Sequence, residues 1–378
     1  MFMKCIHLSD LHIGKKVNEF SMLEDQAYIL TKIINIIDEQ NVEAVFIAGD
    51  VYDKPVPPID AINLFDDFLV RLSKRNLKVF IISGNHDSAE RLAFGGRLMN
   101  QSGIYVSPLY HGDIQPITIQ DDYGDLNIYL LPFIKPANVR HSLEIEVSSY
   151  NEAAEQAINH MNIDTTKRNV LLAHQFVTGA IRSDSEEISV GGSDNVDAHL
   201  FKEFDYVALG HIHRPQKCIY DYIRYSGTPL KYSFSEANHH KSVTIINIQE
   251  KGNLSIEQIP LIPKRDMVEL KGTYNELVAK SFYEHTTYQE DYVHITLTDE
   301  EDILDALAKL RVIYKNIMKL DYDNQRTRHQ SELSLSDAVE EKTPYEHFSD
   351  FYEMMNGQSL NDEQSAFMQQ LIESIWGD

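Results

Sequence analysis

The 378-residue sequence has only two cysteines, Cys5 and Cys218, and no long uninterrupted run of apolar residues. Two cysteines provide neither a disulfide framework nor a thiolate metal cluster, so we expect a reducing, cytoplasmic environment. A transmembrane helix needs roughly 18 or more consecutive apolar residues, and no such run is present. The N-terminus passes from a short apolar stretch into a charged motif at Asp10, which predicts a strand rather than a signal peptide.

Basic residues are also scarce. The 34 Lys and Arg residues against 58 Asp and Glu residues give a net charge of −24 at pH 7. Phosphate contacts need clustered cations, so this balance argues against a self-sufficient nucleic-acid binder. It does not exclude a nuclease, because two bound divalent cations would bring about four positive charges and a partner subunit could supply a basic track.

The length predicts two or three structural units. In the first third, buried apolar runs alternate with helical spacing, which gives a β-α-β-α-β order and implies parallel strands with right-handed crossovers. The expected strands are 5–8, 44–48, 79–83, 127–131, 170–173, 206–209, 224–226 and 242–248, and the expected helices are 23–37, one after Pro57-Pro58, and 151–161. We expect two sheets packed face to face with helices outside, and we place strands 224–226 and 242–248 together in the second sheet.

A break near Pro260 to Pro263 separates this part from a small α+β unit. A polar, charge-rich stretch and two helical segments follow it. Within the α+β unit we expect strands at 267–270, 292–297 and 317–322 and helices at 274–282 and 303–314. The predicted domains are 1–262 (catalytic), 263–324 (α+β cap), 325–342 (linker) and 343–378 (helical tail).

The most informative feature is where the polar residues fall. Five apolar strands each end in a side chain that can bind a metal ion. These side chains are Asp10 with His12, Asp50, Asn85 with His86, His174, and His211 with His213. Because ligands collect at the carboxyl ends of strands in open α/β sheets, we expect these side chains to meet at one edge.

The spacing and the donor types support a metal site. Residues two apart on an extended backbone point the same way, as in the Asp10-x-His12 and His211-x-His213 pairs. A glycine precedes Asp50, Asn85 and His211, where a Cβ would crowd the ions. Carboxylate, imidazole and amide donors without thiolates suit manganese, iron, zinc or magnesium. We expect two divalent ions, with manganese the first choice and magnesium the second.

Each motif alone has a plainer interpretation. A single histidine on an apolar strand is more often a core or surface residue, and an aspartate at a strand end more often caps a helix or a turn. Asn85 could be a turn residue beside Gly84. Only the coincidence of five strand ends favours the metal site over these interpretations.

The segments around these residues also resemble those of a known family. The segments are Asp10-Leu11-His12, Gly49-Asp50-Val51-Tyr52-Asp53, Gly84-Asn85-His86-Asp87, His174 and Gly210-His211-Ile212-His213. They resemble the signature of the calcineurin-like metallophosphoesterase superfamily. The implied fold is α/β, a two-sheet β-sandwich flanked by helices in four αββα layers. Within the superfamily, the chain is similar to the SbcD family of bacterial nuclease subunits, counterparts of the Mre-type repair nucleases. That similarity rests on Asp53-Lys54-Pro55-x-Pro57-Pro58, on Tyr206 to His213, on Arg224 to Leu230, on the domain order and on the tail.

The resemblance also implies roles for the site residues. One metal would be held by Asp10, His12 and His213, the other by Asn85, His174 and His211, and Asp50 would bridge them. His86 would contact the phosphate and protonate or stabilise the leaving alkoxide, with Asp87 orienting or charging its ring. Some relatives carry a histidine where this chain has Asp53, so no catalytic role is transferred to Asp53.

The implied activity is manganese-dependent hydrolysis of DNA. It comprises a 3'-5' double-strand exonuclease that uses ATP through SbcC, an SMC-like ATPase, and a single-strand or hairpin endonuclease, in DNA repair, replication and recombination. The implied assembly is a homodimer within a heterotetramer with SbcC, associated with the nucleoid in the cytoplasm. The cap would help to position DNA over the metals.

The tail helices have apolar faces that could dock on the SbcC coiled coil or pack on their own domain. These faces are Phe348, Phe351, Tyr352 and Met355, then Phe367, Leu371, Ile372, Ile375 and Trp376.

Two other functions stay open. The first is another metallophosphoesterase, such as a nucleotidase, phosphodiesterase or phosphatase. A monoesterase would be expected to bring Arg or Lys to the dianionic phosphate, and the core motifs contain neither. The second is a non-catalytic scaffold, which the intact set of ligand types argues against.

Overall fold

The computed structural model describes residues 3–183, 185–186, 194–324, 327, 344–356 and 359–376. The chain divides into two compact units, Met1–Thr296 with Asp305–Asp321, and Leu297–Leu304 with Tyr322–Asp378. The predicted linker at 325–342 lies outside the described residues except for Thr327. Among the helices described, none combines the length and the apolar character that crossing a membrane requires.

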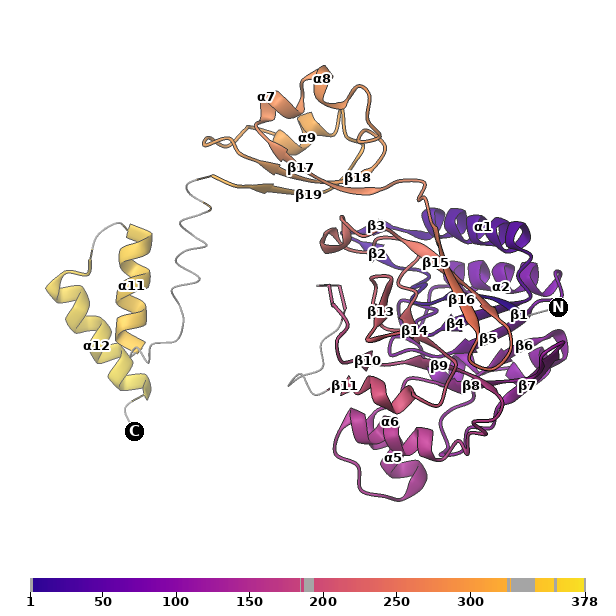
Figure 1. Ribbon diagram of the computed structural model, residues 1–378. Helices are drawn as coiled ribbons and strands as arrows, with labels where there is room; N and C mark the ends of the chain where they lie inside the picture. Colours follow the sequence, from indigo (N-terminus) through magenta and orange to yellow (C-terminus); the bar gives the residue numbers. More distant parts are fainter. Residues whose placement is uncertain are drawn as a thin grey trace. The chain divides into compact units, whose positions relative to one another are not determined.

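The first sheet has six strands in the order β16-β15-β1-β4-β5-β6 (Figure 1). Strands β1, β4, β5 and β6 run parallel, whereas β15 is antiparallel to β1 and β16 is antiparallel to β15. Their bounds are β1 Met3–Leu8, β4 Ala44–Ala48, β5 Lys78–Ile82, β6 Ile104–Val106, β15 Ser242–Ile248 and β16 Leu254–Pro260. The assignment of 242–248 to the second sheet was wrong, because an apolar run shows that a strand is buried but not which neighbour it pairs with.

The second sheet also has six strands, in the order β13-β14-β12-β9-β8-β7. Strands β8, β9, β12 and β14 run parallel, and β7 and β13 are antiparallel edge strands. The bounds are β7 Ile117–Asp121, β8 Gly124–Leu131, β9 Arg168–His174, β12 Tyr206–Gly210, β13 Gln216–Cys218 and β14 Tyr220–Tyr225.

The two sheets pack face to face with helices on the outer sides, as Figure 1 shows. Alternate residues of each strand face opposite ways, so Phe46 of β4 packs between the sheets while Val45 packs toward the helices. Helices α1 (Leu23–Gln40) and α2 (Ile59–Ser73) cover the first sheet. Helices α5 (Pro136–Leu143) and α6 (Tyr150–Asn159) cover the second. The predicted four-layer αββα fold is therefore confirmed.

Short elements in the connections were not predicted from the sequence, since each is too short to show a periodic pattern. They are β2 Lys16–Val17, β3 Phe20–Ser21, α3 Ala89–Leu92, α4 Gly96–Met99, η1 Asn100–Ser102, β10 Phe176–Val177, β11 Asn195–Val196, η2 Ala198–Phe201 and η3 Phe234–Glu236.

A third sheet, β17-β18-β19, forms the predicted α+β part, with bounds Met267–Gly272, Tyr292–Leu297 and Asn316–Tyr322. The helix expected at 274–282 is two short helices, α7 (Tyr274–Leu277) and α8 (Lys280–Tyr283), because Ala279 between them is extended. The helix expected at 303–314 is shorter, as α9 spans Ala306–Leu310.

In the tail, α11 (Pro344–Asn356) and α12 (Asp362–Trp376) contact each other, and Gln364 Nε2 donates to the Tyr352 hydroxyl over 3.0 Å. Phe351 and Phe367 are exposed. The side chains of Met355, Ile375 and Trp376 lie outside the part that the structure describes. The four-domain division itself stays a prediction.

Candidate metal centre

The carboxyl ends of five strands bring the predicted ligands to one rim between the two sheets. Strands β1, β4 and β5 of the first sheet lead into Asp10, Asp50 and Asn85, and strands β9 and β12 of the second lead into His174 and His211. Because the core strands of each sheet run parallel, the ends that carry these residues point the same way within each sheet. All seven predicted ligands lie in this cluster.

The first group consists of Asp10, His12 and His213, whose donor atoms all lie within 4.8 Å of one another. His12 Nε2 and His213 Nε2 are 3.2 Å apart. A neutral imidazole has one lone-pair nitrogen and one N–H, so two nitrogens this close need a shared proton or a cation between them.

The second group surrounds Asp50 and Asn85. Asp50 Oδ2 lies 3.3 Å from His174 Nε2 and 3.8 Å from His12 Nε2. Asn85 Oδ1 lies 3.0 Å from both His174 Nε2 and His211 Nδ1. Asp50 therefore stands between the two groups, with one carboxylate oxygen within reach of histidines from both.

His86 lies at the same rim. Its Nδ1 is 3.1 Å from the Asp53 carbonyl oxygen, and its Nε2 is 4.0 Å from Asp50 Oδ2. His86 also forms a possible metal-binding group with His12 and Asp50, which the sequence did not predict.

The Asp87 carboxylate accepts hydrogen bonds from the backbone N–H groups of Val51, Tyr52 and Gly84 over 2.9–3.1 Å. It ties the loop after β4 to the loop after β5. Whether Asp87 also orients the His86 ring stays a prediction. The neighbouring Asp53 forms an ion pair with Lys15 at 2.7 Å.

The backbone at this rim is strained. Asp10, His12, Asp50 and His211 have positive φ angles of 52°, 44°, 50° and 100°. Such conformations cost of order 1–3 kcal/mol each and persist where the surroundings impose them. Here the Asp10 N–H donates to the Gly49 carbonyl (3.0 Å) and the His211 N–H donates to Asp10 Oδ1 (2.9 Å). Strain concentrated at four predicted ligands is typical of a functional site.

Two glycines allow the close approach of these strand ends. A Cβ at Gly84 would lie 2.1 Å from Asp50 Oδ1. A Cβ at Gly210 would lie 1.9 Å from the Ala48 carbonyl oxygen and 2.6 Å from His174 Nδ1. A side chain at these positions would therefore crowd two predicted ligands and the Ala48 carbonyl, whereas the sequence pattern predicted crowding of the ions.

Burial and charge shift the pKa values of this cluster in opposite directions. Burial raises the pKa of Asp10 to about 6, and burial lowers the pKa of His211 to about 3. Burial would also lower the pKa of His174, yet the facing Asp50 carboxylate raises it to about 9. For Asp50, burial acts to raise the pKa, but His174 and the other histidines hold it well below its usual range.

The donor set fits divalent metal ions. Asp10 Oδ2 and His12 Nδ1 are buried and have no hydrogen-bond partner among the described residues. An unpaired buried carboxylate oxygen is costly, and a bound cation would satisfy it. Oxygen and nitrogen donors in this proportion match borderline or hard divalent metals.

Sequence reasoning missed the residues that surround His213. Glu236 Oε1 lies 3.1 Å from His213 Nδ1, Glu186 Oε1 accepts from the His213 N–H at 2.8 Å, and Lys241 donates to the His213 carbonyl at 2.9 Å. None of the three residues follows a predicted strand. The only signal in the sequence is a lysine directly before the apolar run 242–248.

This fold and this donor set define a metal-dependent phosphoesterase, a hydrolase that acts on ester bonds. A family model described as calcineurin-like phosphoesterase matches residues 3–215, and one described as type 5 capsule protein repressor C-terminal domain matches residues 263–356. A curated protein from Staphylococcus epidermidis, the SbcD component of the nuclease SbcCD, is 31% identical over 381 residues, 99% of each chain. The protein of the same name from Staphylococcus saprophyticus is 30% identical, over 99% of this chain and 98% of its own. The chain therefore belongs to the calcineurin-like phosphoesterases, in their SbcD family.

Among solved structures, a dimetal phosphatase from Danio rerio is 12% identical, with a TM-score of 0.42, over 69% of this chain and 97% of that chain.

Proposed function

We propose that this protein is a manganese-dependent nuclease that hydrolyses phosphodiester bonds in DNA. The observation that carries the proposal is the convergence of Asp10, Asp50 and His174 donor atoms within 4.8 Å, from strands of two different sheets. The family supplies the reaction class, and the staphylococcal relatives, which are named as components of the nuclease SbcCD, support nucleic acid as the substrate.

In this proposal Asp10, His12 and His213 hold one cation, and Asn85, His174 and His211 hold the other. Asp50, whose Oδ2 faces histidines of both groups, bridges them. When bound, two divalent cations supply the positive charge and Lewis acidity that offset the repulsion between a phosphodiester and its nucleophile. Manganese suits the mixture of carboxylate, imidazole and amide donors, and magnesium is the second choice.

His86 serves as the general acid. It is half-buried, and the Asp53 carbonyl beside Nδ1 leaves Nε2 at the rim, on the side of Asp50. From there its imidazolium form, which carries a proton on both ring nitrogens, can donate the Nε2 proton to the departing alkoxide. Asp87 supports this step by fixing the loop through Val51, Tyr52 and Gly84. In this proposal it also orients the His86 ring.

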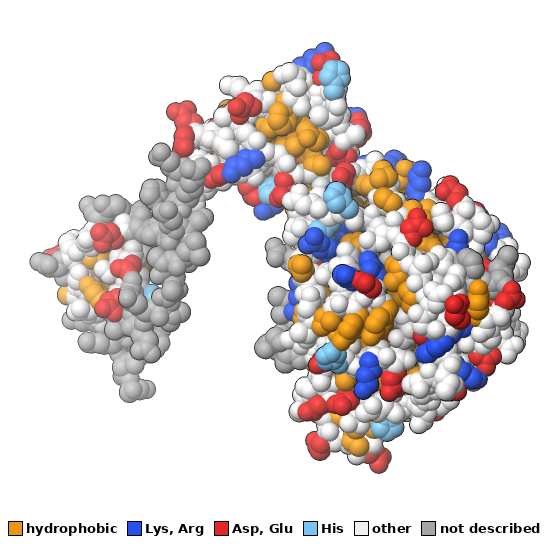
Figure 2. All heavy atoms as spheres, in the orientation of Figure 1, with side chains coloured by type: hydrophobic (Ala, Val, Ile, Leu, Met, Phe, Trp, Pro, Cys, Tyr) orange, Lys and Arg blue, Asp and Glu red, His pale blue; other side chains and the backbone are white. Residues whose placement is uncertain are grey.

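DNA binding needs help from outside this chain. On the face shown in Figure 2, acidic and basic side chains are interspersed, and the net charge is −24. Phosphate contacts require clustered cations. We therefore assign part of the DNA-binding surface to SbcC. SbcC binds this chain through exposed apolar side chains of α11 and α12, such as Phe351 and Phe367. With SbcC and ATP the protein acts as a 3'-5' double-strand exonuclease, and without ATP as a single-strand and hairpin endonuclease, in DNA repair, replication and recombination.

The chain forms a homodimer, and with two SbcC subunits a heterotetramer. Val56, Ile59, Phe94 and Leu98 are 68–85% exposed. Arg91 of α3 donates to the Pro55 carbonyl over 2.7 Å and so joins the two segments that carry them. An apolar surface of this kind is typically buried on assembly.

The domain roles follow from these assignments. Residues 1–262 hydrolyse the substrate, and residues 263–324 form the cap that helps to position DNA over the metals. Residues 325–342 form the linker, and residues 343–378 bind the partner. The complex works at the nucleoid in the cytoplasm.

The test compares hairpin and double-stranded DNA with p-nitrophenyl phosphate as substrates of the purified protein in Mn²⁺. We expect cleavage of DNA and its loss in Asp50→Asn, with the fold retained by circular dichroism. Rapid turnover of the monoester with no cleavage of DNA would reject the nuclease function in favour of a phosphatase. An inert wild-type protein that still binds its partner would favour a scaffold.

A further inference from the structure

A buried carboxylate outside the predicted ligand set faces the far side of His213. Glu236, at the end of η3, is fully buried. Its Oε1 lies 3.1 Å from His213 Nδ1, and its Oε2 accepts from Lys241 Nζ at 2.6 Å and from Thr228 Oγ1 at 3.3 Å. Glu236 therefore links the ring of a predicted ligand to a buried cation.

Lys241 completes a clamp on the same residue. It is 5% exposed, and its ammonium donates to Glu236, to Thr228 Oγ1 at 2.6 Å and to the His213 carbonyl at 2.9 Å. His213 is thus held at its ring by Glu236 and at its backbone by Lys241. All three ammonium donors have acceptors, which a buried lysine requires.

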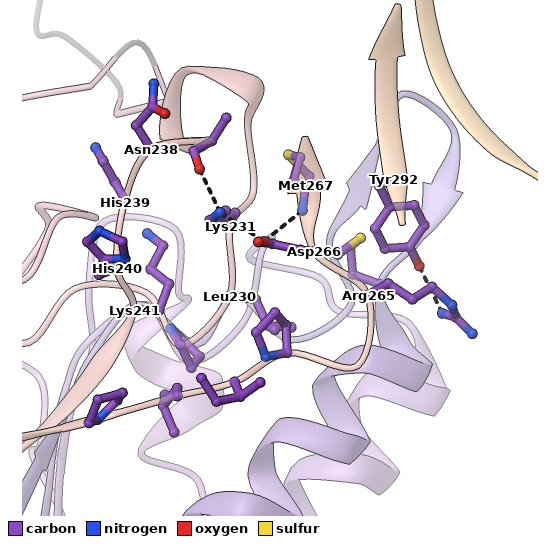
Figure 3. A pocket seen from close by; sticks show the side chains of 17 residues that line it. Leu230, Lys231, Asn238, His239, His240, Lys241, Arg265, Asp266, Met267 and Tyr292 are labelled. Atoms are coloured by element: carbon purple, nitrogen blue, oxygen red, sulfur yellow. Dashed lines mark hydrogen bonds and ion pairs between the residues drawn. The ribbon is translucent and has the colours of Figure 1, made fainter. Parts of the chain in front are cut away.

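The backbone directly after Glu236 is anchored as well. Lys231 donates to the Ala237 carbonyl at 2.6 Å and pairs with Asp266 at 2.8 Å. Figure 3 shows these contacts on the wall of a cavity of about 330 Å³, which Lys241 also lines. No predicted metal ligand lines this cavity. The cavity therefore lies outside the metal centre.

A buried ion pair is a weak source of stability, because both ions lose their hydration. The contribution of this ion pair to stability therefore does not explain its presence, whereas its geometry indicates a role in fixing the tautomer of His213. A carboxylate can only accept at His213 Nδ1, which leaves Nε2 to present its lone pair toward Asp10 and His12. Ser185 Oγ is 3.0 Å from the same Nδ1, but a hydroxyl can donate or accept and does not fix the tautomer.

The residues assigned to the second cation have a different environment. His174 Nδ1 lies 2.8 Å from the Ala48 carbonyl, a neutral acceptor. A carboxylate partner makes an imidazole a stronger donor to a metal than a carbonyl does. We propose that Glu236, held by Lys241, is a positioning residue that orients His213 and sets the affinity of the Asp10–His12–His213 cation in particular. This role rests on the proposed two-metal function.

Calorimetric titration of the full-length protein with Mn²⁺ alone tests the proposal. In Glu236→Gln, we expect one of two cations to bind about 10- to 100-fold more weakly and the other to bind nearly unchanged. Glu236→Gln leaves Lys241 buried without its charge partner, so the double variant Glu236→Met/Lys241→Met is measured as well. It should regain thermal stability but not the lost affinity.

Asp121→Asn is the matched control. It breaks another buried ion pair, Asp121 with Arg168, near the amino ends of β8 and β9. It should lower the unfolding temperature and leave both Mn²⁺ affinities unchanged. Recovery of both affinities in the double variant, or wild-type affinities in Glu236→Gln, would reduce Glu236 to a structural role. A wild-type protein that binds no pair of cations would instead reject the proposed function.

Discussion

His12 and His213 are 201 positions apart in the sequence, and their Nε2 atoms lie 3.2 Å apart. His12 follows a strand of the first sheet and His213 follows a strand of the second. The contact between them therefore depends on how the two sheets pack, and it places two nitrogen donors beside Asp10. Any change that moves one sheet edge against the other should disturb this pair first.

We predict that His86→Gln separates catalysis from metal binding. A positioned general acid contributes typically 10²- to 10⁴-fold, so kcat on a DNA oligonucleotide should fall within that range. The Mn²⁺ stoichiometry should stay at two per chain. His160→Gln, at an exposed histidine, is the control and should leave both quantities unchanged. Loss of one bound Mn²⁺ in His86→Gln would make His86 a ligand, as its grouping with His12 and Asp50 allows.

Gly210→Ala should disrupt the metal centre. The added Cβ would meet the Ala48 carbonyl at 1.9 Å and His174 Nδ1 at 2.6 Å, so β12 or His174 must move. We expect weaker Mn²⁺ binding, loss of cleavage and a lower unfolding temperature. At Gly96, a Cβ would touch only Val106, at 3.6 Å or more, and Gly96→Ala should be tolerated. Wild-type Mn²⁺ affinity in Gly210→Ala would show that this strand end accommodates a Cβ, contrary to the contacts in the structure.

The Asp121–Arg168 ion pair should make stability depend on pH. Burial acts to raise the pKa of Asp121, but hydrogen bonds from Arg168 hold it below its usual value. A carboxyl whose pKa is lower in the folded state stabilises the protein above its unfolded pKa of about 3.9, and this stability is lost as the pH falls through the folded pKa. Asp121→Asn should therefore cost about 3 kcal/mol at pH 7 and progressively less below about pH 4.

Urea unfolding of wild type and Asp121→Asn at pH 7 and at pH 3 measures how the destabilisation caused by the substitution depends on pH. Asp221→Asn, which removes an exposed ion pair with Lys217, should leave stability nearly unchanged at either pH. An Asp121→Asn penalty that is the same at pH 3 and pH 7 would contradict the account.

Phe94→Glu should convert the proposed homodimer to a monomer. Phe94 is 85% exposed, and a charge there would be desolvated on assembly. Light scattering after size-exclusion chromatography gives the mass directly. Val312, 84% exposed in the α+β part, provides the control, and Val312→Glu should stay dimeric. A monomeric wild type, or a dimeric Phe94→Glu, would remove this surface from the assembly.

The sequence was sufficient to predict the core fold and the clustering of the predicted ligands, because both depend on local patterns. A buried strand is an apolar run, and Asp50 or His174 directly after such a run must lie at the sheet edge. The pairing of β15 was not predictable, since Ser242–Ile248 is buried in either sheet. Glu236 was missed for the opposite reason. It follows no strand, and only the folded loop carries its carboxylate to His213.

The break between α7 and α8 also escaped prediction. The apolar spacing from Tyr274 to Phe282 fits one helix, but Val278 ends the first and Ala279 is extended. Local side-chain spacing does not report a single backbone turn of this kind. The sequence pointed to Asp87 only as a possible partner of the His86 ring. The structure adds its contacts with three backbone N–H groups.

The most direct test of the metal centre is the anomalous scattering of crystals soaked in Mn²⁺, recorded on both sides of the manganese absorption edge. We expect two peaks per chain roughly 3.5–4 Å apart. One should lie against Asp10, His12 and His213, the other against Asn85, His174 and His211, and both should contact Asp50. A single peak, or peaks away from Asp50, would contradict the account.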